Sequence, residues 1–96
     1  RQVAAPTGND KTSLLLAARD RPGALYNLLL PFARAGINLT RIESRPSRKK
    51  AWEYVFFIDL LGHADEPQVR EALDEVAEHC VELKVFGSYP MGELED

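Results

Sequence analysis

The pattern of apolar and polar positions along the chain predicts four β-strands. Residues 11–18 contain the small and apolar run 14–18, which is typical of a central strand buried on both faces. Residues 38–45 form a second predicted strand, which Pro46 stops. Residues 52–61 are rich in aromatic and β-branched residues, and in 81–89 Val81, Leu83 and Val85 share one face. We therefore expect four strands.

Two further segments repeat apolar residues every three or four positions, which is the spacing of a helix with one buried face. The first starts after Asp20, its expected N-cap, continues through Pro31 and ends at Gly36, a residue that suits the position after a helix. Its apolar stripe is Ala24, Leu25, Leu28, Leu29, Phe32 and Ala33. The second helix starts near Ala64 or Asp65. Its apolar stripe is Val69, Leu73, Val76, Ala77 and Cys80.

The order of these elements, β-α-β-β-α-β, predicts an α+β fold. Right-handed crossovers fold this order into the ferredoxin-like sandwich, a four-stranded antiparallel sheet with both helices on one face. In that topology the second strand, 38–45, lies at a sheet edge. Turn formers without an apolar period mark 1–10 as a linker, 11–90 form the domain, and the acidic residues 91–96 are expected to be a flexible tail.

The composition excludes several classes of function. The 96 residues suit one domain, and their net charge of −3 argues against a nucleic-acid partner. The apolar runs are far shorter than the ~18 residues of a membrane-spanning helix, so no membrane partner is expected. A single cysteine, Cys80, excludes an internal disulfide or a multi-cysteine zinc site, and is compatible with a reducing cytoplasm.

The polar residues show no catalytic pattern. His63 and His79 have no neighbouring ligand residues at metal-binding spacing, so we interpret His63 as a loop residue and His79 as a helix-end residue. No Ser-His-Asp set, pair of carboxylates or phosphate-binding loop is recognisable. We therefore expect no catalytic residue, no metal and no cofactor.

The first candidate binding feature is the start of the first helix. Its backbone N–H groups and partial positive charge suit a carboxylate, and Gly23 leaves room for a ligand. The alternative is an ordinary helix start in which Asp20 takes those N–H groups. Asn38 offers an amide donor and acceptor to an amino acid, although taken alone it favours the interpretation of a turn-stabilising residue.

The second candidate feature is the edge strand. Glu43 and Arg45 share one of its faces, while Ile42 and Ser44 share the other. The charged residues could simply be solvated and guard the edge against aggregation. In the functional interpretation, this edge pairs with the same edge of a second copy and places Glu43 and Ser44 at the joint.

Three segments together resemble the ACT domain of prephenate dehydratase. They are DRPGALY at 20–26, GINLTRIESRP at 36–46 and WEYVFF at 52–57. Residues 6–13 resemble the junction after the catalytic domain in enzymes fused to chorismate mutase, so the resemblance makes 1–10 a linker from a missing catalytic domain. The ACT domain of aromatic amino-acid hydroxylases shares the ESRP motif and remains an alternative parent.

The resemblance implies a regulatory domain without activity of its own, in a cytoplasmic enzyme. It would bind L-phenylalanine at the interface of a homodimer and mediate feedback inhibition of the catalytic domain in the same polypeptide. The implied ligand-binding residues are Arg21, Pro22, Gly23, Ala24, Leu25, Tyr26, Asn38, Leu39, Thr40, Arg41, Ile42, Glu43, Ser44, Arg45 and Pro46.

Two alternatives in other classes remain. One is a purely structural dimerisation module, although the intact motifs would be dispensable for that role. The other is a small acyl-phosphate hydrolase using Arg21 and Asn38, which is disfavoured because Pro22 lacks an N–H for a phosphate cradle.

Overall fold

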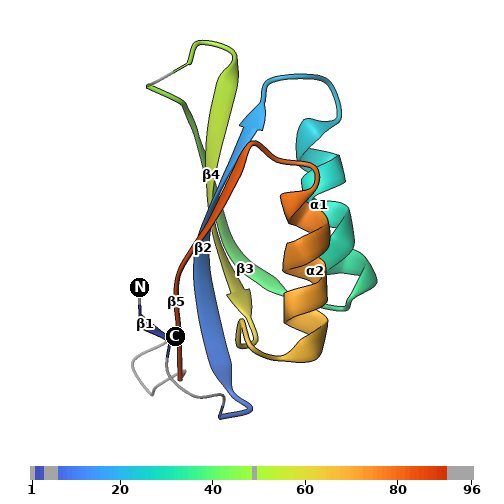
Figure 1. Ribbon diagram of the computed structural model, residues 1–96, viewed down its shortest axis with the longest axis vertical. Coiled ribbons are helices and arrows are strands. Elements are labelled where there is room, and N and C mark those ends of the chain that lie inside the picture. The colour runs from blue at the N-terminus through green and yellow to red at the C-terminus, as the bar shows by residue number, and fades with distance from the viewer. Residues whose placement is uncertain (1, 4–6, 49, 91–96) are drawn as a thin grey trace.

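The computed structural model places the predicted elements in the predicted order and adds one short strand (Figure 1). It describes residues 2–3, 7–48 and 50–90. The elements are β1 (Gln2–Val3), β2 (Asp10–Arg19), α1 (Ala24–Arg34), β3 (Leu39–Pro46), β4 (Glu53–Leu61), α2 (Pro67–Ala77) and β5 (Glu82–Pro90).

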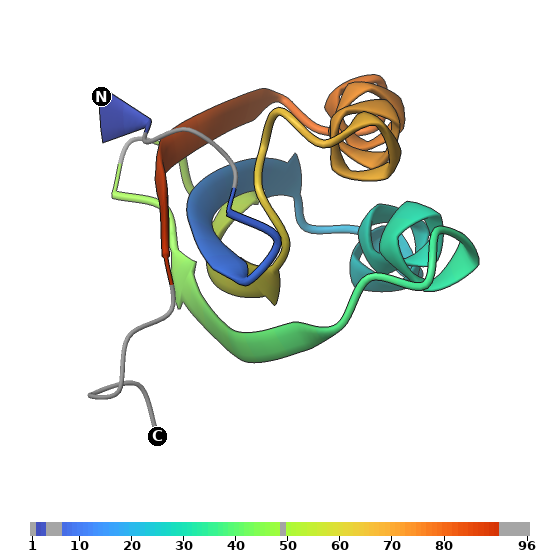
Figure 2. The same ribbon diagram turned by 90° about the horizontal axis from the view of Figure 1, so that it is seen from below.

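The sheet has the order β1-β5-β2-β4-β3. β2 lies at its centre and pairs antiparallel with both β4 and β5, while β3 pairs antiparallel with β4. Both helices cover the same face of the sheet (Figure 2). The predicted ferredoxin-like α+β fold is confirmed, and so is the position of the second predicted strand, β3, at a sheet edge.

β1 lies within residues 1–10, the segment that was expected to be a linker. Gln2 and Val3 pair in parallel with Gly87 and Ser88 and so cover the outer edge of β5. The turn before β2 is also ordered, because the buried Asp10 carboxylate accepts hydrogen bonds from the Thr7 N–H (2.9 Å) and hydroxyl (2.7 Å). Residues 1 and 4–6 and the expected tail, 91–96, lie outside the described residues.

The core forms between the sheet and the two helices. Alternate residues of the strands point toward the helices, whose apolar stripes cover them, and removal of this area from water stabilises the sandwich. An ion pair between Arg34 of α1 and Glu75 of α2 links the helices across their exposed sides. Core side chains include Leu14, Leu16, Leu28, Phe32, Ile58, Leu60, Val69 and Val76.

The helix starts differ from the predicted ones. α1 begins at Ala24 after Gly23, which has φ 79° and occupies the N-cap position, and no side chain caps the helix. The expected Asp20 cap is therefore wrong, because the turn separates Asp20 from the helix by three residues. Glu66 rather than Ala64 or Asp65 precedes α2, since Pro67 is its first residue.

The remaining features of α1 agree with the prediction. The helix continues through Pro31, which is buried, and ends at Arg34. Gly36 follows with φ 71°, a left-handed conformation that glycine adopts without strain.

The second face of the sheet carries no helix. Phe57 of β4 and Phe86 of β5 stack on it with ring centroids 6.4 Å apart, and the Arg45 guanidinium lies 5.4 Å from the Phe57 centroid. Tyr54 and Phe56 of β4 face the helices, on the other side of the sheet from Phe57.

Candidate functional site

The first turn of α1 leaves backbone N–H groups available. The Ala24 N–H donates to the Arg21 carbonyl (3.1 Å), which closes the turn before the helix, and the Asn27 N–H donates to the Gly23 carbonyl (3.0 Å) in the first helical bond. No side-chain oxygen caps the helix, and its first turn contains no acidic residue. The remaining N–H groups of this turn therefore suit a ligand carboxylate.

A cavity of about 290 Å³ opens beside this helix start. The loop after β2 and the first turn of α1 form one wall, β4 supplies two aromatic side chains, and β3 supplies Ser44. Ser44 lies opposite Phe56 in the β3–β4 ladder, so both point to the helix side. The lining residues are Arg19, Asp20, Arg21, Gly23, Ala24, Leu25, Tyr26, Ser44, Tyr54 and Phe56.

Charged and polar groups surround the apolar part of this cavity. Arg19, Asp20 and Arg21 line it, and their side chains form no hydrogen bond or ion pair with other described residues. The hydroxyls of Ser44 and Tyr54 are also without a hydrogen-bond partner in the described part of the chain. The cavity thus combines both signs of charge with an aromatic surface.

The charged residues of β3 point to the opposite face. Glu43 accepts from Arg41 (2.8 Å) and Arg45 (2.7 Å), and it lies opposite Phe57 on the helix-free face. The hydrogen bond from Arg45, with added attraction from Arg41, lowers the pKa of Glu43. Of the ESRP motif, Ser44 alone lines the cavity, whereas Pro46 ends β3 opposite Tyr54.

Asn38 lies at the other end of β3. Its carbonyl accepts from the Leu61 N–H (2.9 Å), and six strand positions, or ~20 Å, separate it from Ser44. Leu39, Thr40 and Ile42 are likewise absent from the cavity lining. Within one chain, the structure therefore does not bring Asn38 together with Gly23.

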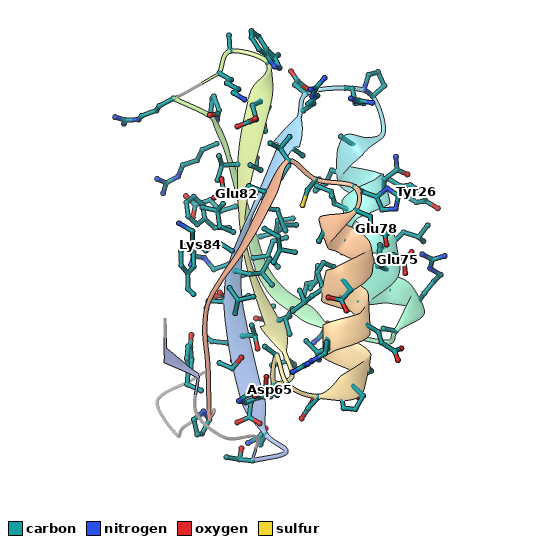
Figure 3. All side chains as sticks on the ribbon, in the orientation of Figure 1. Tyr26, Asp65, Glu75, Glu78, Glu82 and Lys84 are labelled. Atoms are coloured by element: carbon teal, nitrogen blue, oxygen red, sulfur yellow. The ribbon has the colours of Figure 1, made fainter. Side chains whose placement is uncertain are left out.

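Tyr26 and Pro22 lie at the outside of the site. Tyr26 is 66% exposed and points outward from the first turn of α1 (Figure 3). Pro22 is exposed in the turn before Gly23 and does not line the cavity.

Sequence reasoning missed Arg19, Asp20, Tyr54 and Phe56 as members of this cavity. Tyr54 and Phe56 sit at alternate positions of β4, which pairs with β3, and the observed register sets Phe56 opposite Ser44. Pairing between the predicted strands 38–45 and 52–61 was the signal that could have found them. His63 was expected to be a loop residue, and it lies between β4 and α2, but it is fully buried. Its Nδ1 accepts from the Asp65 N–H (3.0 Å).

A second cavity of about 360 Å³ lies between the start of α1 and the end of α2. It shares Arg19, Arg21 and Ala24 with the first cavity, and its other lining residues are Ala18, Asn27 and 78–81. Burial raises the pKa of the Cys80 thiol at its wall. Although this cavity is larger, no Phe, Tyr or Trp lines it, so the first cavity is the better site for an aromatic ligand.

Within the described ranges, no group of three or more His, Cys, Asp or Glu side chains could hold a metal ion. Neither of the two helices there is long and apolar enough to cross a membrane.

The family model for the ACT domain matches residues 12–78, so the chain belongs to the ACT domain family. It is 58% identical over 91 residues to the bifunctional chorismate mutase/prephenate dehydratase of Aquifex aeolicus. The matched region covers 95% of this chain and 25% of that relative. The chain thus spans about a quarter of the length of the curated relatives it matches.

Two solved structures are similar to this chain. Prephenate dehydratase from Arthrobacter aurescens, in complex with L-Phe, aligns with a TM-score of 0.88 and 37% identity, covering 98% of this chain and 31% of that one. GqqA, described as a quorum quenching acylase, aligns with a TM-score of 0.88 and 33% identity, covering 94% and 46%. The Aquifex and Arthrobacter relatives are named as dehydratases, not as aromatic amino-acid hydroxylases.

Proposed function

We propose that this domain binds L-phenylalanine in the cavity beside α1 and regulates a prephenate dehydratase to which it belongs. The uncapped start of α1 beside an aromatic-lined cavity is the observation that carries this proposal. The L-Phe complex of the Arthrobacter relative supports the choice of ligand.

The two ends of the amino acid match two parts of the cavity. Its carboxylate would accept hydrogen bonds from N–H groups in the first turn of α1, where the helix dipole adds attraction. Its ring would pack against Phe56 and Tyr54, and such aromatic pairs add about 0.5–1.5 kcal/mol beyond area burial. The largely buried Phe56 forms the fixed base of the cavity.

A second copy would complete the site through β3. β1 covers the outer edge of β5, whereas β3 pairs only with β4 in the described chain, so β3 offers an open hydrogen-bonding edge. Ile42 is 45% exposed on this edge, and a second copy would remove it from water.

Two-fold symmetry makes this pairing useful for binding. If two β3 strands pair antiparallel about Ile42, residue 38 of one copy lies opposite residue 46 of the other. Asn38 of the second copy then approaches the end of β3 where Ser44 lines the cavity. The proposed site therefore takes its helix start from one copy and Asn38 from the other.

Regulation would follow from this composite geometry. A ligand that contacts both copies stabilises the paired arrangement, and by linkage it shifts any catalytic domain whose activity depends on that arrangement. We propose that the catalytic domain belongs to the same polypeptide, because the Aquifex relative is about four times as long as this chain and is named as a prephenate dehydratase. We further propose that the enzyme that contains this domain is cytoplasmic.

Calorimetric titration of the 96-residue chain with L-phenylalanine tests the proposal, with L-alanine as the control for the side chain. We expect saturable binding of L-phenylalanine, a matching rise of the thermal unfolding midpoint and much weaker binding of L-alanine. Absence of both heat and thermal shift at millimolar L-phenylalanine would contradict the proposal and favour a purely structural dimerisation module.

A further inference from the structure

We infer that Asp20 binds the ammonium group of the bound amino acid and so selects α-amino acids against acids with the same side chain but no amine. This inference deepens the proposed function and rests on it. If Asp20 capped α1, its carboxylate would bind the backbone N–H groups of the helix and could not bind a ligand. Because Gly23 is at the N-cap position, the Asp20 carboxylate does not have this role.

The backbone on both sides of Asp20 is held in place. Its own N–H donates to the Trp52 carbonyl (2.7 Å), and the preceding residue, Arg19, pairs with Glu53 at the end of the β2–β4 ladder. On the other side, the Ala24 N–H donates to the Arg21 carbonyl (3.1 Å) and closes the turn. The sheet and the turn therefore fix the point from which the Asp20 side chain extends.

Asp20 lines the cavity, and its exposed side chain forms no hydrogen bond or ion pair with the other described residues. Several other acidic side chains are engaged: Asp10 by Thr7, Glu43 by Arg41 and Arg45, Asp59 by Ser13, Asp65 by Arg70 and Glu75 by Arg34. Among the described acidic residues that have no side-chain partner, Asp20 is the one that lines this cavity. An unengaged carboxylate at the wall of an aromatic-lined cavity is available to a cationic ligand group.

The charges of the two ligand groups match the two ends of this turn. The start of α1 attracts the carboxylate, and Asp20, a few residues earlier in the turn, attracts the ammonium, which is attached to the same carbon atom as the carboxylate. Both features line one cavity of about 290 Å³, so one small zwitterion can reach both.

The same arrangement disfavours ligands that lack the amine. A 2-oxo acid would place a carbonyl oxygen, which can only accept, where the Asp20 carboxylate needs a hydrogen-bond donor. An acid without the amine would leave the Asp20 carboxylate without a partner. Asp20 would thus distinguish the amino acid from the 2-oxo acid that a transaminase interconverts with it, although both carry the same ring and carboxylate.

The test compares Asp20→Asn with wild type, using L-phenylalanine and 3-phenylpropanoate, which lacks only the amine. Glu78→Gln is the matched control, because Glu78 lies at the end of α2, beside the start of α1, and lines the second cavity but not the first (Figure 3). Thermal unfolding without ligand checks that each variant is folded. Calorimetry then gives each affinity.

We expect Asp20→Asn to weaken L-phenylalanine binding by roughly 10- to 100-fold, the range for one charge-assisted hydrogen bond. Its affinity for 3-phenylpropanoate should stay equal or rise, and Glu78→Gln should change L-phenylalanine binding less than about threefold. Wild type should prefer L-phenylalanine to 3-phenylpropanoate, and Asp20→Asn should lose most of that preference.

Two outcomes would overturn the inference while leaving the proposed function intact. In the first, wild type binds L-phenylalanine and Asp20→Asn binds it equally well. In the second, Asp20→Asn and Glu78→Gln weaken it by the same factor, which would indicate a general effect of charge. A wild-type chain that binds no L-phenylalanine would contradict the proposed function itself and, with it, the role of Asp20.

Discussion

Thr12 and Ser88 are far apart in the sequence, yet their hydroxyl oxygens lie 2.7 Å apart in the buried part of the sheet. Thr12 also donates to the Gly62 carbonyl (2.7 Å), and Ser88 accepts from the Ala64 N–H (3.0 Å). These bonds join β2 and β5 to the loop between β4 and α2. The same loop contains the buried His63.

Replacing Ser88 with Ala should destabilise the ligand-free fold by about 1–3 kcal/mol, because the Ala64 N–H would be buried without an acceptor. For a domain of this size that corresponds to a decrease of several degrees in the unfolding midpoint. Ser44→Ala is the control, since Ser44 is exposed and should change stability by less than about 0.5 kcal/mol. Calorimetric unfolding of both variants measures the difference. Equal midpoints would contradict the role of this hydroxyl pair.

Gly62 should be intolerant of any side chain. Its φ is 126°, and an added Cβ would lie 2.9 Å from Cγ2 of Val69. Gly62→Ala should therefore cost about 2–4 kcal/mol through combined backbone strain and overpacking. Gly36→Ala provides the comparison, because Gly36 also has a positive φ but nothing within 4 Å of an added Cβ. Chemical denaturation should show a clearly smaller loss for Gly36→Ala.

The sequence predicted the fold because its apolar pattern is consistent along the whole chain. Leu14 and Leu16 mark the buried strand, and the stripes through Leu28 and Val69 mark the two helices. β1 could not be predicted, since two residues are too short to show a period. His63 could not be recognised as buried either, because the loop that contains it is held by contacts between residues far apart in sequence, such as the bond from the Ala64 N–H to Ser88.

The site was predictable where it depends on local chemistry and not where it depends on strand register. The sequence placed the start of the first helix close to Gly23. It did not show that Gly23, with its left-handed φ, and not Asp20 occupies the N-cap position, because residue spacing gives no backbone angles. Tyr54 and Phe56 enter the cavity because the β3–β4 ladder sets Ser44 opposite Phe56. If β4 were shifted by one residue in the sheet, both rings would point to the other face.

Asp10 should make stability depend on pH in the acid range. Burial opposes ionisation, but hydrogen bonds from Thr7 and Gly8 outweigh it and hold the pKa of Asp10 below its ordinary value of 3.8. The unfolded chain therefore binds the proton first as the pH falls. The stabilisation is fully present above pH 3.8 and is lost as the pH falls through the lower pKa of the folded state.

Asp10→Asn should lower the unfolding midpoint at neutral pH and reduce its decrease between about pH 4 and pH 2. The control is Asp74→Asn on the exposed side of α2, which should leave the acid dependence close to that of wild type. Thermal unfolding in a series of buffers measures both. An acid dependence that Asp10→Asn leaves unchanged would show that other carboxylates produce it.

Ile42→Asp should prevent pairing of two copies through β3. The substitution places two like charges near the proposed two-fold axis and removes an apolar side chain from the joint. Val81→Asp is matched to it, because Val81 is 51% exposed, close to the 45% of Ile42, but lies before β5. Sedimentation velocity should show dimers for wild type and Val81→Asp and monomers for Ile42→Asp. Dimers of Ile42→Asp would argue for a different interface.

The last prediction tests whether Asn38 acts across the interface. Asn38→Ala should weaken L-phenylalanine binding by about 10- to 100-fold and leave ligand-free stability nearly unchanged, because the Asn38 side chain is exposed and its backbone bond to Leu61 is retained. Ala24→Trp should fill the cavity and abolish binding in the chain that carries it. Neither variant alone then has an intact site.

Mixing the two variants distinguishes a composite site from a site within one chain. In a mixed dimer, the cavity of the Asn38→Ala copy is open, and it meets the intact Asn38 of the Ala24→Trp copy. Random pairing should therefore restore wild-type affinity to about one quarter of all sites, since half of the dimers are mixed and each contains one intact site. Calorimetry of the equimolar mixture should show this high-affinity fraction after subunit exchange. A mixture that binds no better than the average of its components would contradict the composite site and place any contact of Asn38 within its own chain.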